Sequence, residues 1–381
     1  MGTLKKVYLV TWSESGNYGT VLQCFALMHK IRKMNYDVMI LNPFQVNRKL
    51  KSRIKAAAHY MKIYDLYHAV KLFREIQDIG KFRKLYQFEK KYFKERNIYT
   101  RKQYEHLLKE NAVFCTGSDQ IWNTYYSYSD FYFLSFAGSC RRAAYSSSIG
   151  TNKIHPKALH RVRKHLSKFN YIGVREEETV SVLKKLLNRQ DIVHVLDPVL
   201  LLSDSEWNQI LSDVLIEVNL PDRYIICYFV GNSPDYKKQL AKISRLLGIK
   251  NIVEIVSAEY PGFSAGGNLR YRSCGPEEFV YLISHAAFVC TDSFHATAFS
   301  ILYKKQFVTL KRFRDNDKMS QNVRIYSLLR RYHLEEHIYS ESSLEWMNDI
   351  DYDTVYAKLE QDRKFSLDFL RKALGESLHE E

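Results

Sequence analysis

The sequence predicts an α/β protein made of two successive domains, each built on a parallel sheet. Its 381 residues suggest two domains at about 150 residues each. Short apolar strand candidates alternate with helical stretches, the order typical of parallel strands joined by helices. The alternation restarts after the polar stretch Ser203–Pro221. We therefore expect an N-terminal domain over 1–205, a C-terminal domain over 206–350, and a closing helix and tail over 351–381.

The individual elements can be followed in order along the chain. In the first half we expect strands at Val7–Thr11, Asp37–Leu41, Ala112–Thr116, Arg142–Ser146, Tyr171–Val174 and Ile192–Leu196, with helices at Val21–Met34, Lys157–Phe169 and Glu177–Leu187. In the second half we expect strands at Tyr224–Val230, Asn251–Val256, Phe288–Thr291 and Gln306–Leu310, with helices at Pro234–Leu247, Gly275–Ser284, Ser293–Tyr303, Val323–Tyr332 and Tyr352–Leu374. Two such runs predict twin Rossmann-like domains that face a cleft.

The composition excludes several classes of protein. With 46% hydrophobic and 26% charged residues, the chain is neither mainly disordered nor collagen-like. Its uncharged apolar stretches are strand-sized, well short of the roughly 18 residues that a membrane span needs. The apolar part of Met1–Val10 is too short for a signal peptide, so we expect a cytoplasmic protein. Six scattered cysteines without a Cys-x-x-Cys pair favour buried, reduced thiols over zinc ligands or disulfides.

The positive charge is concentrated in one segment. Of the formal net charge of +15, residues 47–110 carry +11, from 18 Lys and Arg against 7 Asp and Glu. The segment is also rich in Tyr and Phe and has a single glycine, Gly80, near which we expect its helices to break. Two interpretations are equally open: a basic helical insert on an anionic membrane surface, or a solvated insert whose rings face the core. Nucleic acid is the least favoured partner, because no nucleic-acid-binding motif accompanies the charge.

Polar loops follow the carboxyl ends of many predicted strands, where ligands bind in open α/β sheets. These loops are Trp12–Thr20, Gly117–Asn123, Ser147–Thr151, Arg175–Glu177 and Asp197–Pro198 in the first half, and Gly231–Ser233, Ser264–Asn268 and Thr291–His295 in the second. Their recurrence at the same edge of both halves predicts one shared site.

The stretch Thr291–Ala298 is the most informative of these loops. Asp292 or Ser293 would cap the following helix and place His295 in its first turn, where free amide groups and the helix dipole favour an anion. A histidine has an ordinary pKa of about 6.5, which suits proton transfer at neutral pH. Helix capping and packing would explain the same residues, so both interpretations stay open.

Other side chains could bind an anion or a sugar. Arg175 could hold a carboxylate or phosphate through two parallel bonds, or it could pair with Glu176–Glu178. Asp119 and Trp122 could bind sugar hydroxyls and a sugar face, or serve as a helix cap and a core residue. Further anion-binding candidates are Lys311, Arg312, Arg314 and Arg324, of which a solvated face explains the first three equally well.

Several common chemistries have no motif in this sequence. It contains no dinucleotide-binding glycine loop, no Walker lysine loop, no zinc-protease motif and no serine-hydrolase motif. Metal-ligand spacing is also missing. We therefore expect a site built from Arg, His, Ser and Asn, with no metal and no cofactor.

Taken together, the polar stretches resemble the polysaccharide pyruvyl transferase family. The matching pieces are Gly16–Gln23, Gly117–Asn123, Val174–Glu176, Leu196–Pro198, Gly275–Phe279, Thr291–Ser300 and Asn322–Ile325. They fall in the family's order between residue 7 and about residue 330. The basic insert and the C-terminal tail have no counterpart.

The resemblance implies two Rossmann-like domains in a GT-B-like arrangement. It also implies transfer of a pyruvyl group from phosphoenolpyruvate to sugar hydroxyls, which forms a ketal on a cell-surface glycan or its lipid-linked precursor. His295 and Arg175 match the family's catalytic residues. We expect donor contacts from Arg175, Ser293, Asn17, Gly19, Lys311 and Arg324, and acceptor contacts from Ser118, Asp119, Gln120, Trp122, Asn123 and Asp292.

Two adjacent positions depart from the family, since better-characterised members carry Arg-Leu-His where this chain has Ser293-Phe294-His295. Either Arg324, Lys311 or Arg312 replaces the missing guanidinium, or the donor differs. Two other functions stay open: a GT-B glycosyltransferase that uses a nucleotide sugar, and a non-catalytic membrane-associated partner in polysaccharide assembly. For a pyruvyl transferase we expect a cytoplasmic protein on the inner face of the plasma membrane, held there by residues 47–110.

Overall fold

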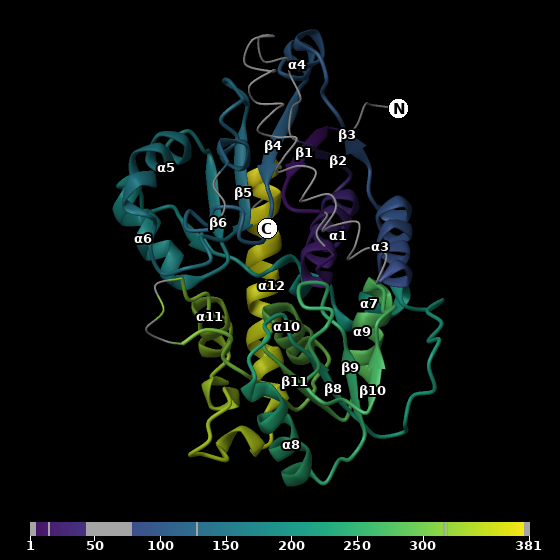
Figure 1. The fold of residues 1–381 in the computed structure, drawn as a ribbon. Helices are drawn as coiled ribbons and strands as arrows, with labels where there is room; N and C mark the ends of the chain where they lie inside the picture. The colour runs from purple at the N-terminus through teal and green to yellow at the C-terminus, as the bar shows by residue number, and fades with distance from the viewer. Residues whose placement is uncertain are drawn as a thin grey trace, which may run out of the picture.

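The computed structural model describes residues 5–13, 16–42, 78–126, 129–314, 317 and 319–376. Two parallel sheets form the upper and lower halves of the molecule, and the long helix α12 (Tyr352–Leu374) runs past both (Figure 1). The prediction of an α/β protein with two Rossmann-like domains in a GT-B-like arrangement is confirmed. The predicted boundary near residue 205 falls within α7 (Asp204–Ile210), between the last strand of the first sheet and the first strand of the second.

The first sheet has seven parallel strands in the order β3-β2-β1-β4-β5-β6-β7. Its strands are β1 (Lys6–Val10), β2 (Asp37–Leu41), β3 (Glu95–Arg96), β4 (Ala112–Thr116), β5 (Arg142–Ser147), β6 (Tyr171–Val174) and β7 (Val193–His194). The chain winds outwards from β1 in both directions, which opens a crevice between the loops after β1 and β4. The register pairs Val10 with Thr116, so both of these loops leave the sheet at the same level.

The second sheet has five parallel strands in the order β10-β9-β8-β11-β12. Its strands are β8 (Ile225–Tyr228), β9 (Ile252–Ile255), β10 (Leu269–Tyr271), β11 (Phe288–Thr291) and β12 (Phe307–Thr309). Tyr228 pairs with Thr291, so the loops after β8 and β11 also start level with each other.

Helices connect the strands and end at recognisable signals. They are α1 (Tyr18–Lys33), α3 (Ile79–Tyr92), α4 (Arg101–Leu107), α5 (Leu159–Leu166), α6 (Glu177–Leu187), α7, α8 (Asp235–Leu247), α9 (Pro276–His285), α10 (Phe294–Leu302), α11 (Val323–Arg331) and α12. α4 begins with a capping box of Thr100 and Gln103, and α9 begins with Pro276 at its first position. α8 ends at Gly248 in the left-handed conformation that glycine adopts without strain.

The structure differs from the predicted elements at the sheet edges. The strand predicted at Ile192–Leu196 shortens to β7, because the amide of Leu196 donates to Ser366 Oγ of α12 rather than to a neighbouring strand. The edge strands β3 and β10 were not predicted, because Glu95–Arg96 and Leu269–Tyr271 lack a clear apolar pattern.

The largest apolar cluster is continuous across the two domains. It includes β1 and α1 of the first domain with α9 and α10 of the second. The ring of Tyr18 stacks on that of Phe279 with centroids 4.8 Å apart, and the Tyr18 hydroxyl donates to the carbonyl of Cys274. A shared core of this kind holds the two sheets in one relative orientation.

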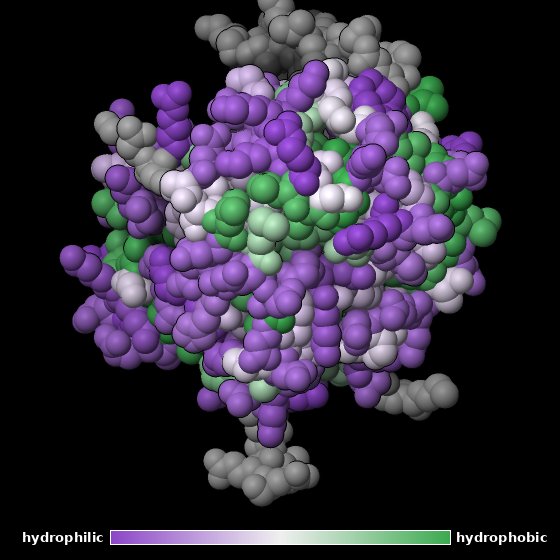
Figure 2. Space-filling view, turned by 90° about the horizontal axis from the view of Figure 1, so that it is seen from below, coloured by the Kyte–Doolittle hydropathy of each residue, from purple (hydrophilic) through white to green (hydrophobic). Residues whose placement is uncertain are grey.

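The exterior is mainly hydrophilic on the face seen from below in Figure 2, with hydrophobic residues near its centre and further ones toward its edges. Among the described residues, no helix combines the length and apolar character needed to cross a membrane. All six cysteines are free thiols, and five of them are buried, as predicted.

The described part of the basic segment, residues 78–110, packs against the body of the protein. Leu85 and Phe88 of α3 are buried, and Phe88 contacts the ring of Phe25 in α1 at 5.4 Å. Gly80 lies in the first turn of α3, where a Cβ atom would meet Ser273 Cβ at 2.7 Å. The ring of Phe88 therefore faces the core, whereas Tyr86 of the same helix is exposed. Residues 47–77, on which the membrane interpretation also rests, lie outside the described residues.

Lys81 of α3 joins the basic segment to both domains. Its side chain is 0% exposed, and its Nζ donates to the carbonyl of Val256 at 3.1 Å and lies 4.3 Å from the centre of the Tyr18 ring. Burial lowers the pKa of Lys81 to about 8. The charged form is therefore costly to keep in the folded protein, although the ring face of Tyr18 offsets part of that cost.

This environment predicts the pH dependence of stability. Lysine in an unfolded chain has a pKa of about 10.4, so between about pH 8 and pH 10 the unfolded chain binds more protons at this position than the folded one. The free energy of unfolding of the wild type should therefore rise with pH relative to Lys81→Met, by up to about 3 kcal/mol. Urea denaturation across this range measures it, with exposed Lys90→Met as the control. If the free energy of unfolding changed with pH in the same way in wild type and Lys81→Met, the lowered pKa of Lys81 would be contradicted.

Candidate functional site

A cleft of about 760 Å³ opens between the carboxyl ends of the two sheets. From the first domain it is lined by the loops after β1 and β4, and from the second by the loops after β8, β9, β11 and β12. The polar lining residues on which the argument depends are Asn17, Asp119, Gln120, His295, Arg312 and Arg324. The predicted shared site at the strand ends therefore corresponds to one hollow in the structure.

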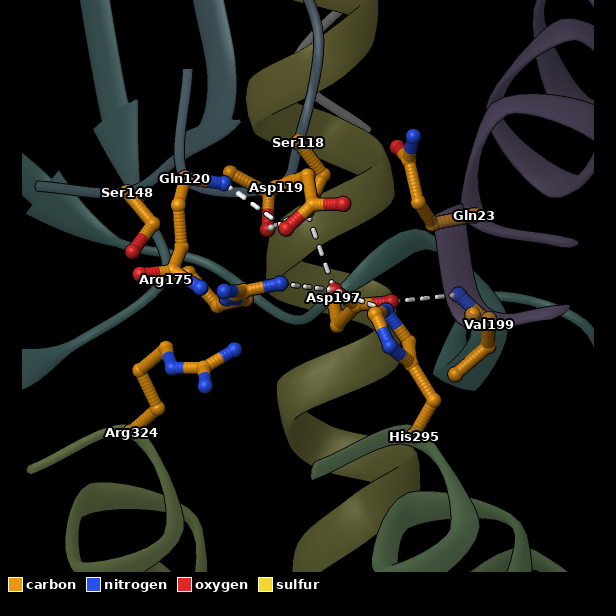
Figure 3. A network of polar contacts seen from close by, with 12 residues as sticks. Gln23, Ser118, Asp119, Gln120, Ser148, Arg175, Asp197, Val199, His295 and Arg324 are labelled. Carbon is orange, nitrogen blue, oxygen red and sulfur yellow. Dashed lines mark hydrogen bonds and ion pairs between the residues drawn. The ribbon is translucent and has the colours of Figure 1, made fainter. Parts of the chain in front are cut away.

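Asp197, which follows β7, lies at the centre of the polar network beside this cleft (Figure 3). Its Oδ2 accepts hydrogen bonds from Ser118 Oγ at 2.9 Å and from Arg175 Nη1 at 3.0 Å, and its Oδ1 accepts from the amide of Val199. Burial disfavours its charge, yet His295 and Arg175 hold the pKa of Asp197 well below its usual range. Asp197 is therefore a buried carboxylate that stays ionised.

His295 reaches this network from the opposite domain. It lies in the first turn of α10, and its Nε2 is 3.5 Å from Asp197 Oδ2, a contact without hydrogen-bond geometry. On its other side the ring packs against α1, where a Cβ atom on Gly19 would lie only 1.9 Å from His295 Nδ1. Only glycine allows the start of α1 to approach the ring so closely.

Arg175, which follows β6, is almost completely buried. Its guanidinium donates to Asp197 and to Glu176 Oε1, and it lies 4.4 Å from the centre of the Phe294 ring. Burial works against its charge, but Glu176 and Asp197 raise the pKa of Arg175 above its ordinary value. Its Nη2 has no hydrogen-bond partner in the described structure. Arg175 and His295 thus contact the same carboxylate oxygen, although Arg175 itself does not line the cleft.

Arg312 and Arg324 bring positive charge to the cleft wall. Arg324, at the start of α11, donates to Gln321 Oε1, which also accepts from Gln120 Nε2 of the first domain. Burial and the neighbouring Arg312 and Arg175 lower the pKa of Arg324 to about 9. Arg324 extends toward the space in front of Arg175 (Figure 3). Since its charge is only weakly compensated, an anion entering the cleft would be stabilised there.

Helix N-termini add to the positive potential. Asn17 caps α1 by accepting the amide of Gly19, and Ser293 caps α10 by accepting the amide of Ala296. Both caps line the cleft. Free amide groups and the helix dipoles favour negative charge at this position.

Asp119 lines the cleft on the side of the first domain. It has a φ of 73°, in the left-handed region, and its Oδ2 accepts a hydrogen bond from Thr20 Oγ1 at 2.7 Å. The strained backbone turns the Asp119 side chain toward α1 rather than along the loop. Among the described residues, no group of three or more His, Cys, Asp or Glu is placed to hold a metal ion.

The structure separates the predicted site residues into three groups. Those that line the cleft are Asn17, Asp119, Gln120, Ser293, His295 and Arg324. Those that support the lining from behind are Gly19, Ser118 and Arg175. Those outside the lining are Trp122, Asn123, Asp292 and Lys311. Of the three cations expected to replace the missing arginine, Arg312 and Arg324 reach the cleft and Lys311 does not.

Two of the predicted acceptor contacts require correction. Trp122 is 1% exposed and stacks on Phe133 at 5.5 Å, because its loop turns the ring into the apolar cluster beneath the sheet. Asp292 is fully buried, and its carboxylate accepts the amides of Val230 and Gly231 and the hydroxyl of Tyr236. These bonds fix the loop after β8, so neither side chain faces a ligand.

Neither Asp197 nor Gln321 was among the individually predicted site residues. Asp197 stood in a polar loop at a strand end and in the matched piece Leu196–Pro198, but nothing in the sequence showed that it would meet residues that follow β4 and β6 and a residue of α10. Gln321 carried no signal, since its importance comes from its contacts with Gln120 and Arg324 across the cleft.

The fold and the site define a two-domain protein with a cationic cleft between Rossmann-like halves. The chain belongs to the polysaccharide pyruvyl transferase family, whose model matches residues 17–312 and so covers most of it. None of the curated proteins matches the chain.

Several solved structures resemble the chain at low sequence identity. UDP-GlcNAc 2-epimerase from Methanocaldococcus jannaschii, in complex with UDP-GlcNAc and UDP, is 12% identical over 97% of this chain and 99% of that one, with a TM-score of 0.48. UDP-GlcNAc 2-epimerase from Neisseria meningitidis, bound to UDP-GlcNAc, is 10% identical over 97% and 100%, with a TM-score of 0.47. UGT89C1 from Arabidopsis thaliana, complexed with UDP, is 10% identical over 98% and 100%, with a TM-score of 0.49.

The contact between Gly19 and His295 gives a specific test. Gly19→Ala should displace the imidazole from its position between α1 and Asp197, because the new methyl group would overlap the ring. The catalytic rate of the protein should fall at least tenfold, because the imidazole is no longer in place. The melting temperature should change little, since the His295 side chain can rotate to relieve the overlap. Gly262→Ala is the control, because no atom lies within 4 Å of a Cβ there. Wild-type turnover in Gly19→Ala would show that the position of His295 is not critical.

The buried Asp197 carboxylate gives a second test. Asp197→Asn should lower the free energy of unfolding at pH 7 by about 3–5 kcal/mol, because Arg175 loses a buried counter-charge. A carboxylate with a lowered pKa stabilises the fold above its unfolded pKa of about 4 and loses this effect as the pH falls through its folded pKa. The difference between wild type and Asp197→Asn should therefore shrink below about pH 4. Urea denaturation measures it, with exposed Asp213→Asn as the control, and a difference independent of pH would contradict the ionised state.

Proposed function

We propose that this protein transfers a pyruvyl group from phosphoenolpyruvate to two hydroxyls of a sugar and so forms a ketal. The observation that carries the proposal is the meeting of Arg312, Arg324 and His295 at the N-termini of α1 and α10 in one cleft. Phosphoenolpyruvate carries a phosphate and a carboxylate, and both suit guanidinium groups and helix N-termini. Membership of the family supports the same transfer.

The reaction needs one proton-carrying group near the donor. A sugar hydroxyl attacks C2 of the enol phosphate and gives up its proton while C3 takes one, so that the double-bond electrons form the new C3–H bond. Phosphate then leaves C2 with its bonding electron pair, and a second hydroxyl attacks C2, closes the ketal and passes its proton to the departing phosphate. His295 is the histidine among the lining residues, its Nε2 lies 3.5 Å from Asp197 Oδ2, and an imidazole can both donate and accept a proton at neutral pH. Phosphoenolpyruvate is a substrate here, and the proposal requires no cofactor.

The proposal predicts that His295→Ala abolishes turnover and leaves the fold intact. Loss of the acid-base group should lower kcat by at least a hundredfold. Phosphate release from phosphoenolpyruvate with an acceptor glycan, together with a mass gain on the glycan, measures it. His285→Ala, at the exposed end of α9, is the control. Near-wild-type turnover in His295→Ala would remove this residue from the mechanism, and a wild type without any turnover would favour a non-catalytic role in polysaccharide assembly.

Donor choice separates pyruvyl transfer from glycosyl transfer. Phosphoenolpyruvate should raise the melting temperature of the wild type, whereas UDP- and GDP-sugars should not. Arg324→Met should reduce this effect and raise KM for phosphoenolpyruvate about tenfold or more, because a buried cation of the cleft is lost. Lys311→Met is the matched control, since Lys311 lies outside the lining. Stabilisation by a nucleotide sugar alone would point to a GT-B glycosyltransferase.

We further propose that the acceptor is a cell-surface glycan or its lipid-linked precursor, bound by a cytoplasmic protein at the inner face of the plasma membrane. The support is the net charge of +11 that residues 47–110 carry in the sequence. Within residues 78–110, part of this charge is paired, as in Lys84–Glu278, Lys91–Glu277 and Lys94–Asp37.

The membrane proposal is tested with vesicles that contain anionic lipids. Exchanging Lys49, Lys51 and Lys55 for Gln should weaken binding at low salt by about a hundredfold, at about 1 kcal/mol per lysine near the surface. The matched control exchanges Lys237, Lys238 and Lys242 of α8 for Gln. Unchanged binding, or a wild type that does not bind, would assign the basic segment another role.

A further inference from the structure

Aromatic residues line the cleft beside its cationic groups. They come from both domains and are Trp12, Tyr126, Tyr132, Tyr260, Phe294 and Phe313. A cleft of about 760 Å³ is much larger than a three-carbon phosphoester requires. Space therefore remains for a second ligand in contact with these rings.

Trp12 and Tyr132 form a fixed aromatic wall. Trp12 follows β1, and Tyr132 belongs to η1 (Asp130–Phe133); their ring centroids are 6.4 Å apart at 87°, an edge-to-face pair. Both residues are held through their backbones: the carbonyl of Trp12 accepts Gln23 Nε2 at 2.9 Å, and that of Tyr132 accepts Trp122 Nε1 at 3.0 Å. The buried Trp122 thus supports the wall from behind and does not touch a ligand itself.

Amide and carboxylate groups lie in the same lining. Asn17 and Gln120 come from the first domain, and Asn232 and Glu259 from the second. A pyranose ring has an apolar face of C–H groups and a rim of hydroxyls, which aromatic rings and amide or carboxylate groups match respectively. A second small anion would gain nothing from the rings, and a purely apolar ligand would leave the polar groups without partners.

We propose that the aromatic wall of Trp12 and Tyr132 is the acceptor subsite and that it binds one pyranose ring of the acceptor. Its role as acceptor subsite rests on the proposed function, but binding of a sugar to the wall does not require a donor. Trp12 and Tyr132 are then residues that determine acceptor specificity, with His295 in the same cleft to serve the reacting hydroxyls.

Tryptophan fluorescence can test this inference without turnover. The chain has four tryptophans, of which Trp122, Trp207 and Trp346 are at most 1% exposed, while Trp12 is half-buried in the cleft. Acrylamide should therefore quench mainly Trp12, and Trp12→Phe identifies that component. Methyl β-glycosides of glucose, galactose, mannose and N-acetylglucosamine serve as probes. At least one of them should protect Trp12 from quenching.

Variants of the wall separate sugar binding from general effects. Tyr132→Leu should weaken the protection by the best probe about tenfold and raise KM for the acceptor without changing KM for phosphoenolpyruvate. Exposed Tyr86→Leu on α3 is the matched control, and its melting temperature is compared with that of Tyr132→Leu. Failure of all four sugars to protect Trp12, or protection unchanged in Tyr132→Leu, would overturn the inference. If a sugar protected Trp12 from quenching but phosphoenolpyruvate did not raise the melting temperature, the sugar site would stand and phosphoenolpyruvate would be refuted as the donor.

Discussion

The site depends on one buried negative charge, the carboxylate of Asp197. It contacts Ser118 after β4, Arg175 after β6 and His295 of α10, which places residues of both domains around one group. A buried charge is stable only when such partners are present and well placed, so the requirement to compensate Asp197 also fixes the positions of its partners. The imidazole of His295 and the guanidinium of Arg175 are thereby held at the same carboxylate oxygen.

Packing between the domains gives this charge network its geometry. The stacked rings of Tyr18 and Phe279 and the close approach of Gly19 to His295 join α1 directly to α9 and α10. Lys81 adds a third connection, from the basic segment to both domains. Tyr18 and Phe279 belong to one continuous apolar core, which fixes the position of the two cleft walls relative to each other.

The structure shows what surrounds Ser293-Phe294, where the family resemblance implies an arginine and a leucine. The ring of Phe294 covers the guanidinium of Arg175, whereas Arg312 and Arg324 supply the positive charge that faces the cleft. The lowered pKa of Arg324 reflects burial next to two other guanidinium groups, a repulsion that a bound dianion would relieve. The same cleft carries aromatic rings from both domains, which suits a ligand with one anionic and one sugar component.

The sequence by itself determined most strands and helices and the family, because apolar periodicity and local motifs are properties of neighbouring residues. β2, β4, β6, β11, α6 and α12 begin and end where the sequence predicted. Only the tertiary structure decided that Trp122 packs inward, that Asp292 binds backbone amides, and that Asp197 and Gln321 belong to the site. The direction of a side chain and its partners depend on segments far away in the chain, and a single sequence does not show which distant loops will meet.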